Sequence, residues 1–126
     1  MTTTGCYLGL MSGTSADAVD VVIVDFANDK INLTASHSVA LSSSIRQQIH
    51  ALATPSDNEI DHLGELDQQL GEVFADSINQ LIKKSQLSPN RVMAIGSHGQ
   101  TIRHRPPGSV THPFTLQIGD PNVIAE

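Results

Sequence analysis

The chain is short and acidic, with 126 residues, seven Lys and Arg, thirteen Asp and Glu, and a formal net charge of −6. Its length suffices for one compact domain with a hydrophobic core. The negative balance gives no general electrostatic attraction to nucleic acid or to an anionic membrane, so we expect neither as a partner. The single cysteine, Cys6, excludes an intrachain disulfide and favours a reducing compartment.

The first residues predict no targeting segment. Residues 1–5 contain no basic side chain, and the apolar run that follows is interrupted by small polar residues at 12–15. A signal peptide needs a basic start and an unbroken apolar core, and a membrane span needs about twenty apolar residues. We therefore expect a soluble cytoplasmic protein.

The first third of the sequence predicts three strands joined by short turns. The apolar run 7–11 indicates a buried strand, the β-branched run 19–26 a second, and the loosely alternating run 30–41 a third. Residues 12–18 have the small polar composition of a tight turn, and 28–29 supply another. Such short connections favour an antiparallel meander.

Two helices are predicted next. Apolar residues spaced three or four apart over 45–52 indicate a short helix with an N-cap among 42–44, ended by Thr54 and Pro55. Residues 56–59 match the Ser-x-x-Glu capping box, which predicts the start of a long amphipathic helix over 60–84. Two lysines in its last turn suit the helix dipole.

The last third of the sequence predicts two further strands and a helix start. Residues 92–95 indicate a buried strand ending at 96–100, 101–111 a polar, proline-rich loop, and 114–118 an alternating strand. Asp120 and Pro121 fit the N-cap and the first position of a helix whose sequence reaches only to Glu126. A helix of so few residues is unstable alone, so we expect 1–126 to be the N-terminal part of a larger protein.

The turn between the first two strands is the main candidate site. Small residues let backbone amides approach an anion closely, and Gly13 permits φ values that other residues resist. Hydroxyl donors come from Ser12, Thr14 and Ser15. Asp17 and Asp20 would repel a phosphate directly, so their expected use is to hold Mg²⁺ or its water shell. The alternative is a plain Ser/Gly hairpin with two solvated aspartates, which the spacing alone favours.

A second candidate site follows the strand at 92–95. His98 and Gln100 lie two residues apart and would either direct polar groups at a sugar hydroxyl or cap loop backbone. The spacing of His98, His104 and His112 matches no compact zinc pattern. The basic cluster 103–105 would be either a solvated loop or a contact to an anionic ligand.

Several nucleotide and hydrolase motifs are absent from the sequence. The chain contains no Gly-x-x-x-x-Gly-Lys-Ser/Thr loop, no Gly-x-Gly-x-x-Gly after a strand and no Gly-x-Ser-x-Gly elbow. These absences exclude a P-loop NTPase and count against a dinucleotide-binding domain and an α/β-hydrolase.

Three segments, 9–20, 96–101 and 118–120, together resemble the bacterial anhydro-N-acetylmuramic acid kinases, in order and over essentially the whole chain. The resemblance implies an α/β lobe of the actin/hexokinase-like (ribonuclease H-like) fold. Such a lobe has a mixed sheet with an antiparallel three-strand meander and flanking helices, and a second lobe completes the active site.

The resemblance also implies an activity: ATP- and Mg²⁺-dependent opening and phosphorylation of 1,6-anhydro-N-acetylmuramic acid to N-acetylmuramic acid 6-phosphate, in cell-wall recycling, by a homodimer. Carried over by motif, the ATP phosphate loop comprises Ser12, Gly13, Thr14, Ser15, Ala16, Asp17, Ala18, Val19 and Asp20. Asp17 would be the metal residue, and His98 and Gln100 would lie on the sugar side.

The chain departs from the family pattern at two loop positions. Ala16 stands where the family usually has Leu or Met, and Ala18 stands where it usually has Gly. If position 18 needs a positive φ, alanine there costs about 1 kcal/mol or more.

The catalytic base that the resemblance implies is an aspartate in a later Asp-Thr-Gly-Pro-Gly-Asn stretch. We expect this aspartate to lie beyond Glu126, so we expect the isolated chain to be inactive. The alternatives are another sugar or carboxylate kinase of this fold, or a non-catalytic nucleotide-binding module.

Overall fold

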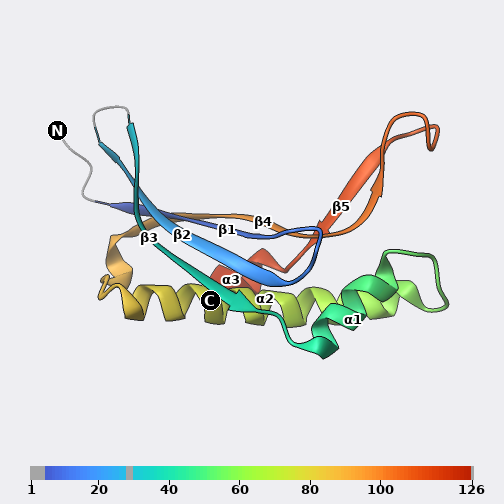
Figure 1. The fold of residues 1–126 in the computed structure, drawn as a ribbon, viewed down its shortest axis with the longest axis horizontal. Helices are drawn as coiled ribbons and strands as arrows, with labels where there is room; N and C mark the ends of the chain where they lie inside the picture. Colours follow the sequence, from blue (N-terminus) through green and yellow to red (C-terminus); the bar gives the residue numbers. More distant parts are fainter. Residues whose placement is uncertain (1–4, 28–29, 126) are drawn as a thin grey trace.

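A computed structural model of the protein describes residues 5–27 and 30–125. Within these residues, one sheet of five strands packs on one face against helices, and the long helix runs along the sheet (Figure 1). The elements in chain order are β1 (Cys6–Ser12), β2 (Ala18–Ala27), β3 (Lys30–Ala40), α1 (Ser43–Leu52), α2 (Glu59–Lys84), the 3₁₀ turn η1 (Pro89–Arg91), β4 (Val92–Arg105), β5 (Phe114–Ile118) and α3 (Pro121–Ala125). The turn expected at 28–29 lies outside the described residues, and so does Glu126, the last residue of the expected helix.

The sheet is mixed, with the strand order β3-β2-β1-β4-β5. β1 to β3 form the predicted antiparallel meander, β4 pairs parallel with β1, and β5 pairs antiparallel with β4. Helices connect β3 to β4, as a parallel crossover requires. The predicted fold class is therefore confirmed: an α/β domain with a mixed sheet, a three-strand meander and flanking helices.

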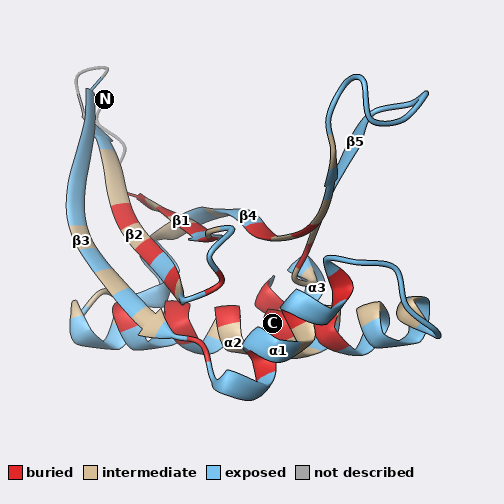
Figure 2. Ribbon diagram, turned by 45° about the vertical axis from the view of Figure 1, so that its right-hand side comes forward, coloured by how far each residue is buried: buried red, intermediate tan, exposed pale blue. Residues whose placement is uncertain are grey.

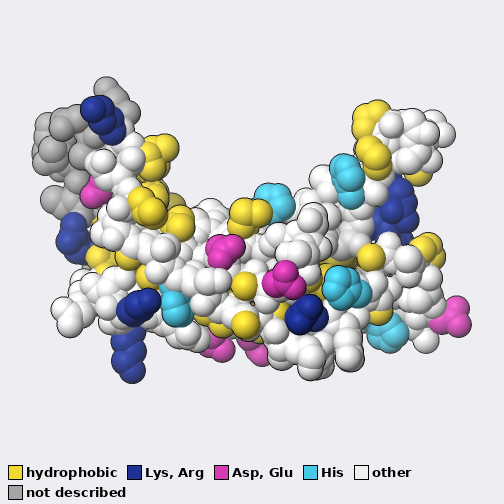
Figure 3. Space-filling model, in the orientation of Figure 1, with side chains coloured by type: hydrophobic (Ala, Val, Ile, Leu, Met, Phe, Trp, Pro, Cys, Tyr) yellow, Lys and Arg dark blue, Asp and Glu magenta, His cyan; other side chains and the backbone are white. Residues whose placement is uncertain are grey.

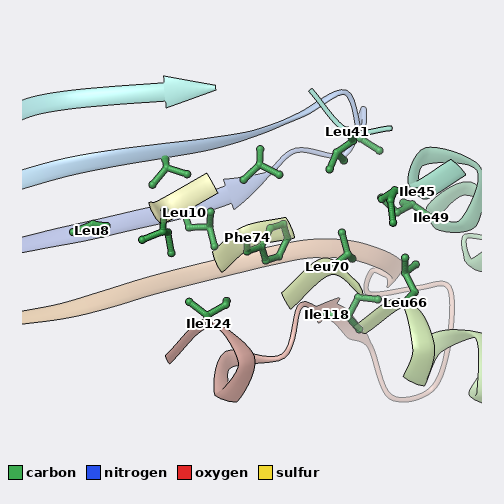
Figure 4. Packing of buried hydrophobic residues seen from close by; sticks show 14 of the residues in the cluster. Leu8, Leu10, Leu41, Ile45, Ile49, Leu66, Leu70, Phe74, Ile118 and Ile124 are labelled. Carbon is green, nitrogen blue, oxygen red and sulfur yellow. The ribbon is translucent and has the colours of Figure 1, made fainter. Parts of the chain in front are cut away.

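The core lies between the sheet and α2, where each element contributes its apolar face. Alternate residues of β1 and β2, such as Leu10 and Ile23, are buried, as the period of a strand requires (Figure 2). The 3.6-residue period of α2 buries Leu66, Leu70 and Phe74 (Figure 4). Phe74 is fully buried. None of the described helices combines the length and apolarity needed to cross a membrane.

Two predicted helix starts are confirmed by their caps. The Ser42 hydroxyl accepts from the backbone N–H of Ile45 at 3.2 Å, which caps α1. The Asp120 carboxylate accepts from the backbone N–H of Asn122 at 2.9 Å, with Pro121 as the first residue of α3. Each side chain satisfies an N–H group that lacks a partner within its helix.

The predicted capping box at 56–59 is wrong in its cap residue. α2 begins one residue after Asn58, which adopts the left-handed conformation and makes no side-chain cap hydrogen bond. Glu59 does reach back to the Ser56 backbone N–H at 3.4 Å, as in a capping box. The Glu59 carboxylate also accepts a hydrogen bond from Arg103 of β4 at 2.9 Å. The sequence around 56–59 could not predict this contact, because Arg103 lies in a distant segment.

The predicted loop over 101–111 is also partly wrong, because β4 continues through 96–100 to Arg105. The residues after Gln100 extend beyond β1 and pair with β5, for example His104 with Thr115. These residues are polar because much of this hairpin projects from the body of the domain, where one face of a strand meets solvent (Figure 1).

Candidate functional site

The candidate phosphate loop is a tight turn between the central strand β1 and β2. The backbone N–H of Ala16 donates to the carbonyl of Gly13 at 3.0 Å, which closes the turn. The backbone N–H of Leu41 donates to the carbonyl of Asp17 at 3.0 Å, which fixes the end of the turn to the start of the helical layer. The turn is therefore held from inside and from the neighbouring segment.

Backbone strain in this turn lies at Ala16. Ala16 has a φ of 56° and is fully buried, whereas Ala18 opens β2 and pairs with Ala40. The positive φ considered for position 18 therefore belongs to position 16. Gly13 does not adopt a left-handed φ, so the conformational freedom expected of it is not used. A Cβ at Gly13 would meet only the Ser15 hydroxyl, at 4.0 Å, so the missing side chain leaves open space beside the backbone.

The nine predicted loop residues differ in exposure, with Gly13 and Ala18 intermediate between two groups. Thr14, Ser15, Asp17 and Asp20 are exposed, whereas Ser12, Ala16 and Val19 are buried. Within the described residues, no hydrogen bond uses the hydroxyl of Thr14 or Ser15. Thr14 and Ser15 thus offer two exposed hydroxyl donors beside the open space at Gly13, a combination that could accept a phosphate if Asp17 and Asp20 point away from it or hold a cation.

Asp17, the predicted metal residue, lies on the rim of the turn and forms an ion pair with Arg46 of α1 at 3.3 Å. Its side chain is 67% exposed, so the pair contributes only about 0–1 kcal/mol and leaves the carboxylate accessible. Across 5–27 and 30–125 no group of three or more His, Cys, Asp or Glu could hold a metal ion by itself. A single exposed carboxylate fits Mg²⁺ that is held mainly by phosphates and water.

Gln100 is fully buried and lies beside the loop. Its side-chain oxygen accepts from the Ser12 hydroxyl, and its amide nitrogen donates to the carbonyls of Gly13 at 3.0 Å and Thr101 at 3.1 Å. Sequence reasoning grouped Gln100 with His98, but the structure separates them: His98 is exposed. A sugar contact by His98 and Gln100 stays a prediction, and the buried contacts give Gln100 a direct connection to the phosphate loop.

The separation of His98 from Gln100 arises from a bulge in β4. Leu10 of β1 pairs with Ser97 and the next residue, Met11, pairs with Gly99, so His98 is left without a partner in β1. Gly99 has a φ of 76°, and a Cβ there would lie 2.5 Å from the carbonyl oxygen of Ile118. The bulge therefore requires glycine at position 99, and it changes which face of the sheet the following side chain meets.

Sequence reasoning missed the ion pair between Glu59 and Arg103, at 2.9 Å. Arg103 also donates to the carbonyl of Leu52 at 2.8 Å, so it joins the end of α1, the start of α2 and β4. The hydrogen bond from Arg103 lowers the pKa of Glu59 below its ordinary value. Desolvation opposes this shift, and the Ser56 backbone and the Arg103 charge add smaller lowering effects. Arg103 is thus not a solvated loop residue, because its Nη2 binds both Glu59 and the Leu52 carbonyl.

Charged side chains on the face seen in Figure 3 are scattered among apolar and neutral residues, without one dominant charged patch. Several large apolar side chains are exposed as well, among them Ile31, Leu33 and Ile60.

The sequence predicts no catalytic base among residues 1–126. The expected aspartate would follow Glu126, and Glu126 itself lies outside the described residues. The position of the base beyond Glu126 therefore stays a prediction, whereas residues 12–20 of the candidate phosphate loop all lie within the described structure.

Comparison with known proteins identifies the family. A family model described as anhydro-N-acetylmuramic acid kinase matches residues 5–126. The chain is 50% identical over 120 residues to a protein of that name from Saccharophagus degradans, and 51% identical over 119 residues to one from Shewanella baltica. Each match covers 94% of this chain and 32% of the relative, so the chain spans about a third of the length of these curated relatives. With its mixed sheet and its loop at the end of β1, the chain belongs to the anhydro-N-acetylmuramic acid kinase family.

Proposed function

We propose that this chain carries the ATP phosphate loop of a kinase that acts on 1,6-anhydro-N-acetylmuramic acid. The whole enzyme would open the anhydro ring with water and phosphorylate the sugar, giving N-acetylmuramic acid 6-phosphate for cell-wall recycling. The observation that carries the proposal is the exposed turn at the end of β1, which has free Thr14 and Ser15 hydroxyls and open space at Gly13.

ATP would supply the phosphoryl group, and Mg²⁺ would offset the negative charge of its phosphates. On this chain, the Thr14 and Ser15 hydroxyls and the backbone amides of the turn would bind and orient the phosphates. Asp17 would bind Mg²⁺ or its water, because its carboxylate is exposed beside these donors. Arg46 would keep the Asp17 side chain close to the turn.

The sugar would lie on the side of β4 that carries His98. Phosphoryl transfer needs both reactants held in one geometry and a base that accepts a proton from the attacking water. We assign no base within 1–126, so we propose that the second lobe of the full-length enzyme supplies it, from an aspartate beyond Glu126. We further propose a cytoplasmic location, as expected from the sequence, and a homodimer, as expected from the resemblance to the family.

Calorimetry with Mg-ATP on the 126-residue chain tests the phosphate loop. The wild type should bind, and Asp17→Asn should bind Mg-ATP more weakly while its binding of ATP without Mg²⁺ changes less. Asp61→Asn, on the exposed face of α2, is the matched control and should behave as wild type. A wild-type chain that is folded but gives no binding heat would refute the loop assignment.

Turnover measurements separate the proposed enzyme from the other readings. The isolated chain should not consume ATP in the presence of the anhydro sugar, and turnover by it would overturn our placement of the base. A full-length protein that phosphorylates another sugar or a carboxylate instead would favour a different kinase of the fold. One that binds ATP but never consumes it would favour a nucleotide-binding module.

A further inference from the structure

The structure assigns Gln100 as the positioning residue of the phosphate loop, with Ser12 as its partner rather than as a phosphate ligand. This inference rests on the proposed function for the identity of the ligand. The inference changes the roles expected for both residues. Ser12 was predicted to contact ATP and Gln100 to contact the sugar, whereas here both stabilise the loop.

The first argument is the hydrogen-bonding capacity of the Gln100 amide. A glutamine side chain offers two N–H hydrogens and one carbonyl oxygen. Both hydrogens are used on backbone carbonyls, those of Gly13 and Thr101, and the oxygen accepts from Ser12. The reverse orientation of the amide would place its oxygen against two carbonyl oxygens, so these neighbours fix which way the amide lies.

The second argument is the state of the Ser12 hydroxyl. Its proton is donated to Gln100, and its side chain is almost fully buried at 1% exposure. A side chain that binds a phosphate must donate a hydrogen bond to it, and a hydroxyl group can donate only one. The remaining side-chain donors of the turn are therefore the exposed hydroxyls of Thr14 and Ser15.

The third argument is where Gln100 acts on the loop. Gly13 is the first residue of the turn, and its carbonyl receives both the Gln100 amide and the backbone N–H of Ala16. One carbonyl is thus fixed by the turn itself and by a residue 87 positions away. Ala16 has a positive φ, which residues other than glycine normally avoid. The hydrogen bond from Gln100 helps to hold the turn in this strained conformation.

The strand that carries Gln100 also carries His98, which the resemblance places on the sugar side. The bulge at His98 and Gly99 sends His98 to the exposed face and Gln100 to the buried position beside Ser12. One rigid strand therefore connects the sugar side of the site to the phosphate loop. Because β4 carries both residues, the sugar side and the phosphate loop are held at a fixed distance from each other, which helps to position the two reactants.

A double-mutant cycle on Mg-ATP affinity tests the assignment in the 126-residue chain. Gln100→Met keeps the side-chain volume and removes all three hydrogen bonds, and Ser12→Ala removes one. We expect the Kd of Gln100→Met to rise about tenfold or more, and Ser12→Ala to add little to it, because both act through one network. Thr14→Ala should weaken binding on its own, because Thr14 is a proposed phosphate donor and makes none of the hydrogen bonds of Gln100. Gln117→Met, which removes a glutamine from neighbouring β5, is the matched control and should leave the Kd within about twofold.

Amide hydrogen exchange without nucleotide gives a second readout, independent of any ligand. Gln100→Met should speed exchange at 13–17 at least about tenfold, while exchange in the middle of α2 stays as in the wild type. Unchanged loop exchange would overturn the positioning role, and a multiplicative effect of Ser12→Ala on Gln100→Met would return Ser12 to the phosphate ligands. A wild type that does not bind Mg-ATP would refute the proposed function alone, because the exchange result still decides the role of Gln100.

If Gln100→Met does not fold, Ser12→Ala decides the question, since it leaves the buried Gln100 oxygen without its donor and so loosens the amide that holds the Gly13 carbonyl. Faster exchange at 13–17 in that variant, with weaker Mg-ATP binding, supports the network. Exchange equal to that of the wild type overturns it.

Discussion

Two glycines of α2, Gly64 and Gly71, should respond in opposite ways to the same substitution. Both lie inside the helix, where glycine is about 0.8–1 kcal/mol less favourable than alanine. A Cβ at Gly64 would meet no atom within 4 Å, so Gly64→Ala should raise the free energy of unfolding by about 1 kcal/mol. A Cβ at Gly71 would lie 3.0 Å from the Val123 Cβ and 3.1 Å from the Asp120 carbonyl oxygen.

Gly71→Ala therefore sets the same gain in helix propensity against a collision with α3. Overpacking of this kind costs about 1–3 kcal/mol, so the net change should lie between about 0 and −2 kcal/mol. Urea unfolding followed by circular dichroism measures both variants, with melting temperatures as a check. For a domain of this size, about 1 kcal/mol corresponds to roughly 3–5 °C.

The comparison tests whether α3 packs on the middle of α2. Equal stabilisation by both alanines would refute that packing, since the two substitutions differ only in what the new methyl group meets. The packing matters for function, because α3 follows Asp120, and Asp120 is tied to α2 through the backbone of Asp67 and the side chain of Gln68.

Three further predictions concern stability. Glu59→Gln should lower the melting temperature at pH 7, and the difference from wild type should shrink as pH falls below the ordinary glutamate value of about 4.3. Arg103 lowers the pKa of Glu59, so the stabilising charge is fully present above the ordinary value and is lost as pH falls through the lower folded value. A difference that stays constant as pH falls from 7 through the acid range would contradict this. Phe74→Ala should cost about 3–5 kcal/mol in urea unfolding, against less than about 1 kcal/mol for the half-exposed Phe114→Ala. Ala16→Gly should change stability by less than about 1 kcal/mol, because relief of the positive φ is offset by loss of a buried methyl group and by a more flexible unfolded chain; stabilisation well above that, measured by the same assay, would show that strain dominates.

Local sequence patterns were sufficient for much of the fold. The β-branched run of β2 and the 3.6-residue period of α2 each specify one element without reference to the rest of the chain. The caps at Ser42 and Asp120 also depend on neighbouring residues alone. The order of the three motifs was sufficient for the family, which the comparisons confirm.

The errors arose where contacts between distant segments decide the local structure. Residues 101–105 are polar and flank a proline-rich stretch, yet they form a strand because β5 pairs with them. The burial of Gln100 depends on the bulge at His98 and Gly99. A bulge shifts the alternation of buried and exposed side chains, and the two-residue period of a strand does not predict this shift. The partner of Glu59 lies 44 positions away in the sequence. The positive φ of Ala16 was not visible because alanine normally avoids it.

The parallel pairing of β1 with β4 affects how the protein folds as it is made. β1 lies at the centre of the finished sheet. Its residue Ser12 pairs with Gln100 of β4, which lies 88 positions later in the chain. At a synthesis rate of about 5–20 residues per second, one edge of β1 stays unpaired for several seconds or more after β2 and β3 can pair. An open edge on an apolar strand is a template for pairing with another chain. β4 therefore both closes this open edge of β1 and, through Gln100, holds the Gly13 carbonyl at the end of the same strand.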